Sequence, residues 1–209
     1  MPDLASVLEQ ARVPEHSAPF MQAMSQGTAF LEGEYLFLTA DDWLMAIGYP
    51  LSGEYAHDSF ERALAAALRR VPKRLEGVDC WAIGPDLPAR LAGHVTDRDT
   101  FYILPSDAPV TARLRRPVEN AAEKLTVRAG RDFTPAHRRL WAEFMNRAVL
   151  PPNVRGLFAR TGAVLDTPGL RLLDAVDAEG NLAASLLLDD APRRFCSYLI
   201  GAHSRTHYT

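Results

Sequence analysis

The chain has 209 residues, of which 47% are hydrophobic and 23% are charged, and its formal net charge is −3. These proportions are ordinary for a soluble globular protein with one large domain or two small ones. A slightly acidic chain has no global basic field to recruit DNA or an anionic lipid surface. No apolar run approaches the length of a membrane span, and the first residues lack the pattern of a signal peptide, so we expect a cytoplasmic protein.

Elements predicted in the first part of the chain begin with two short helices, the first of them capped by Asp3. A loop over 48–55 precedes a stronger, alanine-rich helix that Pro72 ends. The predicted helices are 3–12, 17–26, 59–71 and 86–93. The predicted strands are 34–40, 43–48, 78–83 and 100–104.

The second part opens with a basic helix over 113–125. Pro117 fits that helix only if its first turn begins near Arg116. Two further helices and a closing meander of three apolar strands follow, and Gly162 is expected to end the second of these helices. The predicted helices are 135–149 and 154–161. The predicted strands are 126–129, 170–176, 182–188 and 195–200.

The two cysteines, Cys80 and Cys196, both lie in apolar runs that resemble strands. Small apolar thiols in such runs are usually buried, and a cytoplasmic protein rarely forms disulfides. We therefore expect two buried free thiols.

The order of elements repeats along the chain, because each part has two helices followed by a meander. The first part continues with helix, strand, helix and strand, whereas the second stops after its meander. This order predicts an α+β fold with a mixed sheet, divided into a first unit over 1–112 and an incomplete second unit over 113–209.

Three short segments carry a resemblance to a known superfamily. They are Ala46-Ile-Gly-Tyr-Pro-Leu51 before an alanine-rich helix, the basic segment Arg113 to Ala122, and Tyr198-Leu-Ile-Gly-Ala202. With the order of elements, they resemble GNAT acyltransferases of the tandem type found in FemAB-like aminoacyltransferases and in the acyltransferase region of lysyl-phosphatidylglycerol synthases.

The resemblance implies transfer of an acyl or aminoacyl group to an amine, with acyl-coenzyme A or aminoacyl-tRNA as donor. GNAT enzymes hold acyl-coenzyme A where two parallel strands splay apart, with the pyrophosphate at a helix N-terminus. Segments 74–79 and 90–95 approach the usual donor motif but fail at its last position, so the donor-binding residues stay unassigned. The resemblance places them beyond Thr209.

Candidate site residues come from the loop, the basic helix and the last strand. Arg113, Arg115 and Arg116 suit a small-molecule or nucleotide-linked acceptor or a lipid headgroup. Tyr49 would line a ligand loop. The alternatives are a solvated helix face that pairs with acidic neighbours, and a tyrosine-packed turn.

Tyr198 and His203 are the catalytic candidates. Tyr198 can give a proton to a leaving thiolate, and His203 can act as an acid or base. The alternatives are a core tyrosine and a frayed terminus. His203 and His207 have a spacing that suits zinc on a helix, but no third ligand is nearby, so no metal is expected.

A second hypothesis is a binding or assembly module without catalysis. The apolar edge at 193–202 would then pair with another chain, which predicts a possible homo-oligomer. A third hypothesis is an enzyme of another class that shares only this order of elements.

Overall fold

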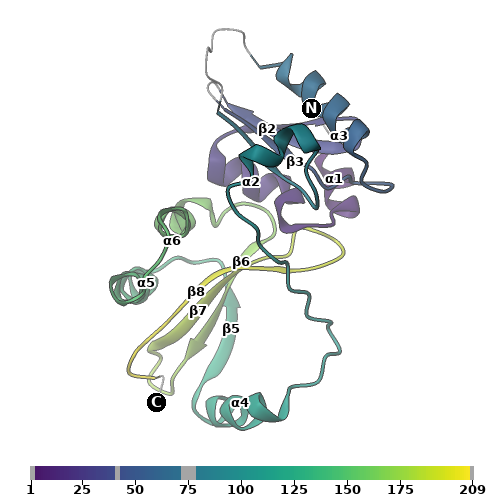
Figure 1. The fold of residues 1–209 in the computed structure, drawn as a ribbon. Helices are drawn as coiled ribbons and strands as arrows, with labels where there is room; N and C mark the ends of the chain where they lie inside the picture. Colours follow the sequence, from purple (N-terminus) through teal and green to yellow (C-terminus); the bar gives the residue numbers. More distant parts are fainter. Residues whose placement is uncertain (1–2, 41–42, 72–78, 208–209) are drawn as a thin grey trace.

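The computed structural model describes residues 3–40, 43–71 and 79–207. In this part of the chain the strands form two four-stranded sheets, with strand orders β1-β2-β3-β4 and β5-β6-β7-β8. The sheets belong to successive halves of the chain, and helices pack against both (Figure 1). The prediction of an α+β fold with a mixed sheet is confirmed.

The first sheet is antiparallel except for its last pair, β3 and β4, which run parallel. Its strands are β1 (Thr28–Glu32), β2 (Tyr35–Ala40), β3 (Trp43–Ile47) and β4 (Asp79–Ile83). The helical segments of this half are α1 (Leu4–Gln10), η1 (Pro14–His16), α2 (Ala18–Ser25), α3 (His57–Leu68) and η2 (Ala89–His94).

Helices cover both faces of the first sheet. One face, with Leu36, Leu38 and Ile47, packs against Val7 of α1 and Ala18 of α2. The opposite face packs against α3, whose apolar residues at spacings of three and four face the sheet. Burial of apolar surface on both faces makes this half a three-layer unit.

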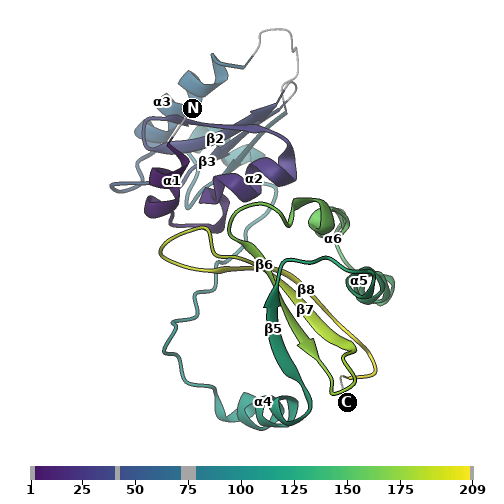
Figure 2. The same cartoon turned by 180° about the vertical axis from the view of Figure 1, so that it is seen from behind.

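The second sheet is antiparallel throughout, with small irregularities of register on either side of β7. Its strands are β5 (Thr126–Gly130), β6 (Leu170–Val176), β7 (Leu182–Asp189) and β8 (Ser197–His203). The helices of this half are α4 (Ala112–Lys124), α5 (Pro135–Arg147) and α6 (Pro152–Val164). Figures 1 and 2 show α5 and α6 on one side of this sheet and α4 at one end of it.

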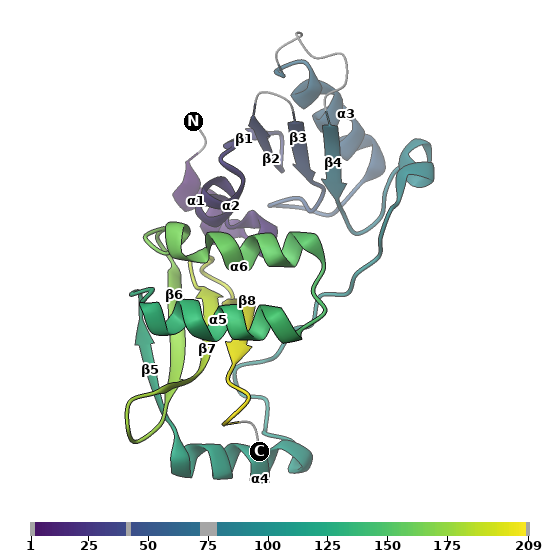
Figure 3. The ribbon, with the colours of Figure 1, turned by 90° about the vertical axis from the view of Figure 1, so that its left-hand side faces the viewer.

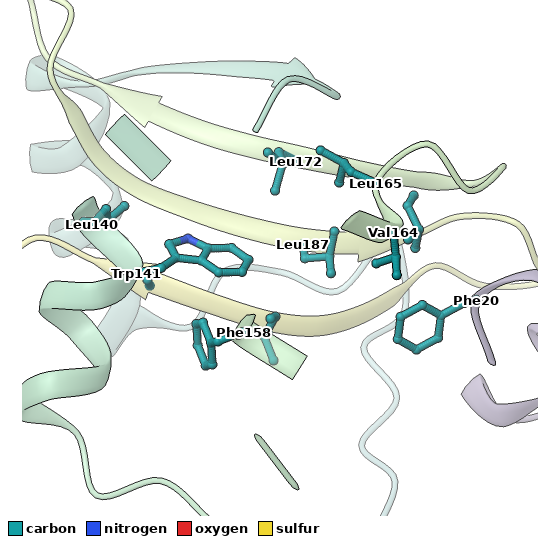
Figure 4. Packing of buried hydrophobic residues seen from close by; sticks show 11 residues of the cluster. Phe20, Leu140, Trp141, Phe158, Val164, Leu165, Leu172 and Leu187 are labelled. Atoms are coloured by element: carbon teal, nitrogen blue, oxygen red, sulfur yellow. The ribbon is translucent and has the colours of Figure 1, made fainter. Parts of the chain in front are cut away.

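A single apolar core joins α5 and α6 to the second sheet. Trp141 is 1% exposed and makes edge contacts with Phe133 and Phe158, with ring centroids 5.3 and 4.9 Å apart. Phe20 of α2 belongs to the same cluster, so the two halves share part of their core (Figure 4). Arg160 of α6 also donates to the carbonyl of Met24 at the end of α2.

Two predictions about elements are wrong, and one strand was not predicted. Residues 100–104 form no strand and join neither sheet, and Tyr102, Ile103 and Leu104 are 92%, 89% and 85% exposed. A strand over 28–32 was not predicted, and it is β1. The helix expected at 86–93 is instead the 3₁₀ segment η2.

Two predictions about helix ends are also wrong. Pro117 lies inside α4, which begins at Ala112 rather than near Arg116. Gly162 lies inside α6, which continues to Val164. A β-carbon at Gly162 would lie 2.7 Å from Cδ1 of Phe133, so this glycine lets an aromatic ring pack against the helix.

The expected burial of the thiols is wrong as well, because Cys80 and Cys196 are both exposed and free. Cys80 lies on β4 at the edge of the first sheet, and Cys196 lies just before β8. The apolar runs around them did not reveal this exposure. Within the described residues, no helix has the length and hydropathy that crossing a bilayer requires.

Candidate functional site

The two halves repeat one arrangement, in which two helices precede a three-strand antiparallel meander. In the first half these are α1, α2 and β1 to β3, and in the second α5, α6 and β6 to β8. Ligands of sheets with parallel strands bind at the carboxyl ends of those strands. The ends of β3 and β8 are therefore the equivalent places in which to look for a site.

The end of β3 is closed. The N–H of Gly48 donates to the carbonyl of Ile83 over 2.6 Å, which extends the pairing of β3 and β4 to the ends of both strands. A β-carbon at Gly48 would lie 2.9 Å from the same carbonyl oxygen. The parallel pair does not splay here, so it leaves no wedge for an acyl donor.

The charges around the start of α3 also disfavour an anion. The cap residue Ala56 offers no side-chain hydrogen bond, and Asp58 lies in the first turn. His57 Nε2 lies 3.0 Å from Oδ2 of Asp86. Carboxylates at this helix terminus already satisfy its positive end, and they oppose a pyrophosphate.

The loop that contains Tyr49 is held by a buried histidine. His16 is 0% exposed; its Nδ1 accepts from the backbone N–H of Arg12 over 3.0 Å, and its Nε2 donates to the carbonyl of Tyr49 over 2.9 Å. Burial, helped by the charge of Arg12, lowers the pKa of His16 to about 4, so the ring is neutral.

Tyr49 itself packs edge-on against Phe101, with ring centroids 5.9 Å apart. Burial and the nearby Glu15 raise the pKa of its hydroxyl. These contacts match the alternative interpretation of this loop as a tyrosine-packed turn. A role for Tyr49 in substrate binding stays a prediction.

The end of β8 contacts a basic and an aromatic side chain from α5. Arg147, the last residue of α5, lies with its guanidinium 3.0 Å from Nδ1 of His203 and donates to the carbonyl of His203. The ring of Phe144, one turn earlier, lies edge-on to the His203 imidazole, with ring centroids 5.5 Å apart. Cζ of Arg147 lies over the same ring, 5.4 Å from its centroid. The strand end is therefore fixed by a cation and an aromatic ring from α5.

Acidic and basic groups meet at this end. Glu143 lies 3.7 Å from Arg147 and accepts from the backbone N–H of Arg205 over 3.2 Å. In the part of the chain that the structure describes, β8 has β7 on one side and no strand on the other. The open edge therefore lies beside an arginine and a histidine, side chains that suit an anionic group.

The predicted catalytic residues lie on one face of the second sheet. Tyr198 pairs with Leu188 and His203 pairs with Ala184, and the register shift between these pairs places both side chains on the same side of β8. Tyr198 is 63% exposed, and partial burial raises the pKa of its hydroxyl. The Tyr198 hydroxyl lies 3.2 Å from the position that a β-carbon on Gly201 would take, so the ring extends along the strand toward His203. The catalytic roles of Tyr198 and His203 stay predictions.

The arginines of α4 lie at the same end of the second sheet as His203. Thr126, the first residue of β5, pairs with Val176, and His203 pairs with Ala184 just after the turn that follows Val176. Figure 3 shows α4 at the end of the second sheet toward which β8 runs. Arg113, Arg115 and Arg116 are all exposed there, and their predicted role in binding an acceptor stays a prediction.

Sequence reasoning missed Arg147, Phe144 and Glu143. Their spacing on one helix was visible, but their proximity to His203 arises from packing of α5 against β8. His207 instead lies 3.1 Å from Asp177. Among the described residues, no group of three or more histidine, cysteine, aspartate or glutamate side chains is placed to hold a metal ion.

The architecture is that of an α+β protein with two four-stranded sheets. No protein-family model matches the sequence, and no curated protein matches it significantly. A solved structure with a similar fold is that of L-PGS from Bacillus licheniformis, with a TM-score of 0.51 and 16% identity over 97% of this chain. The chain spans 65% of the length of that solved chain.

Proposed function

We propose that this chain belongs to a protein that transfers an acyl or aminoacyl group to an amine. The observation that carries the proposal is the similarity of fold to L-PGS, a lysyl-phosphatidylglycerol synthase, over 97% of the chain. The element order and the motifs at 46–51, 113–122 and 198–202 support the same superfamily. Tandem GNAT-like units, the second of them incomplete in this chain, are part of the proposal.

The proposed chemistry is direct transfer. The amine attacks the carbonyl carbon of the donor, and backbone N–H groups stabilise the oxyanion of the tetrahedral intermediate. Its collapse breaks the thioester or tRNA ester bond, and the leaving thiolate or ribose alkoxide takes up the proton that the amine loses. The end of β8 is the proposed position of the donor. Arg147 would attract its phosphate groups and His203 would serve as the nearby acid or base, while the α4 arginines would receive an anionic acceptor.

Titration with acetyl-coenzyme A and with aminoacyl-tRNA, followed by calorimetry, tests this placement and separates the two donor classes. Loss of a charge-assisted hydrogen bond costs about 1.5–3 kcal/mol, so we expect Arg147→Met to weaken donor binding at least about tenfold. Arg62→Met, on the exposed face of α3, is the matched control and should leave binding unchanged. Absence of binding by the unmodified chain at millimolar donor would contradict a donor site here.

Assembly is the second candidate function, and the open outer edge of β8 favours it. An unpaired strand edge is a template for strand addition by another chain. Sedimentation velocity over a hundredfold range of concentration should then show self-association. A constant monomer throughout would contradict it.

A further inference from the structure

Arg147 contacts His203 at two atoms through a single guanidinium nitrogen. Its Nη2 lies 3.0 Å from Nδ1 of His203 and also donates to the carbonyl oxygen of the same residue. A guanidinium has only donors and stays protonated, so the ring nitrogen that it meets must be the acceptor. In the neutral ring of His203, Nδ1 therefore carries no proton and Nε2 carries one.

A second contact favours the opposite tautomer. Nδ1 of His203 also lies 3.4 Å from the carbonyl oxygen of Ser204, a group that can only accept. A hydrogen bond there would need a proton on Nδ1, which the Arg147 contact forbids. The Arg147 contact is the shorter of the two, and a hydrogen bond from a charged donor is about twice as strong as one between neutral groups. Arg147 therefore decides which ring nitrogen is protonated.

The neighbours of Arg147 on α5 hold its guanidinium in this position. Cζ of Arg147 lies over the ring of Phe144, and Nη1 lies 3.7 Å from a carboxylate oxygen of Glu143. The Phe144 ring also lies edge-on to the His203 imidazole, so one aromatic ring orients both groups. Both contacts leave Nη2 of Arg147 for His203.

We propose that Arg147 is a positioning residue that fixes His203 in the tautomer with its proton on Nε2. His203 then offers a hydrogen bond from Nε2 and cannot accept a proton at Nδ1. For catalysis the inference rests on the proposed function, and it narrows the role of His203 from acid or base to that of a neutral donor toward a negatively charged oxygen. Neutral imidazoles stabilise oxyanions in this way in other enzymes.

The chemistry of the ring excludes the other two roles. The ring cannot take a proton from the attacking amine while Nδ1 accepts from Arg147 and Nε2 is already protonated. Transfer of the Nε2 proton to the leaving group would leave an imidazolate anion, which is far less stable than imidazole near neutral pH. The group that Nε2 meets is therefore an acceptor oxygen rather than the amine.

The catalytic part has its own readout in a transfer assay. His203→Gln places an amide N–H where Nε2 donates but cannot take up a proton, so it should keep the rate within about tenfold of the unmodified chain. His203→Ala lacks the donor and should lose about a hundredfold, the usual effect of removing one donor to an oxyanion. Equal losses in the two variants would overturn the donor role. Absence of transfer by the unmodified chain would contradict the proposed function instead.

Nitrogen NMR on the full chain tests the tautomer without any ligand. Long-range correlation of ring nitrogens with ring protons in the 15N-labelled chain distinguishes a protonated from a bare nitrogen, and His203→Gln assigns the signals among the six histidines. At about pH 8, where an ordinary imidazole is neutral, we expect the form protonated on Nε2. In Arg147→Met only the Ser204 contact acts on Nδ1 among these two, so at least about half of the ring should change to the form protonated on Nδ1.

Arg139→Met is the matched control, because it removes the same charge from an exposed position of α5. It should leave the His203 signals unchanged. A ring protonated on Nδ1 in the unmodified chain would overturn the proposal, and so would a tautomer that Arg147→Met does not change. These spectra need neither a donor nor a transfer assay, so their outcome is separate from that of the proposed function.

Discussion

Replacement of Trp141 with alanine should lower the free energy of unfolding by about 3–5 kcal/mol, the usual cost of removing a fully buried indole. Trp141 is 1% exposed and contacts the rings of Phe133 and Phe158, which tie the start of α5 and the middle of α6 to one another. The cavity that alanine leaves is lined by side chains from α5, α6 and the second sheet, so it cannot collapse without moving a helix.

Urea denaturation followed by circular dichroism measures this loss. Trp141→Phe keeps most of the volume and should cost about half as much. Tyr102→Ala is the matched aromatic control, because Tyr102 is 92% exposed and its loss should change stability by less than about 0.5 kcal/mol. Equal losses for Trp141→Ala and Tyr102→Ala would show that α5 and α6 do not form this core.

Elements with strong local signals could be predicted from the sequence. The stripe of α3, at spacings of three and four, and the alternating strands β6 and β7 bury apolar surface within short stretches of chain. The helix that begins at Pro135 also agrees, because proline at the first turn needs no intrahelical N–H partner. In these cases the local pattern and the final packing favour the same structure.

The wrong predictions concern features that distant residues decide. The run 100–104 has a strand-like composition, but a strand forms only by pairing with another strand, and these residues join neither sheet. Gly162 has the usual identity of a helix end, yet packing of Phe133 requires it inside α6. Exposure of Cys80 depends on its place at a sheet edge, which composition alone does not reveal.

The candidate site was partly predictable for the same reason. His203 ends an apolar strand, a position that sequence alone can indicate. Its partners Arg147 and Phe144 lie more than fifty residues earlier and reach it only through packing of α5 on β8. The closure of β3 against β4 likewise depends on one backbone hydrogen bond, from Gly48 to Ile83, that no sequence pattern predicts.

Acidification should destabilise this protein through His16. Its pKa falls from 6.5 to about 4 in the folded chain because burial penalises the charged ring. The unfolded chain therefore binds a proton at a pH where the folded chain does not, so stability is complete above pH 6.5 and is lost as the pH falls toward 4. A shift of this size corresponds to a loss of about 3 kcal/mol at most, at about 1.4 kcal/mol per pKa unit.

His16→Gln isolates this contribution. The glutamine carbonyl can accept from the N–H of Arg12 and its amide can donate to the carbonyl of Tyr49, but the side chain does not titrate. Burial raises the pKa of the neighbouring Glu15, which acts in the opposite direction as the pH falls, and both chains retain that effect. The difference in unfolding free energy between the two chains, measured by urea denaturation from pH 7 to pH 4.5, should therefore change by about 2–3 kcal/mol in favour of the glutamine variant. A difference that is independent of pH would show that His16 is not held neutral, and that the loop after β3 is fastened in another way.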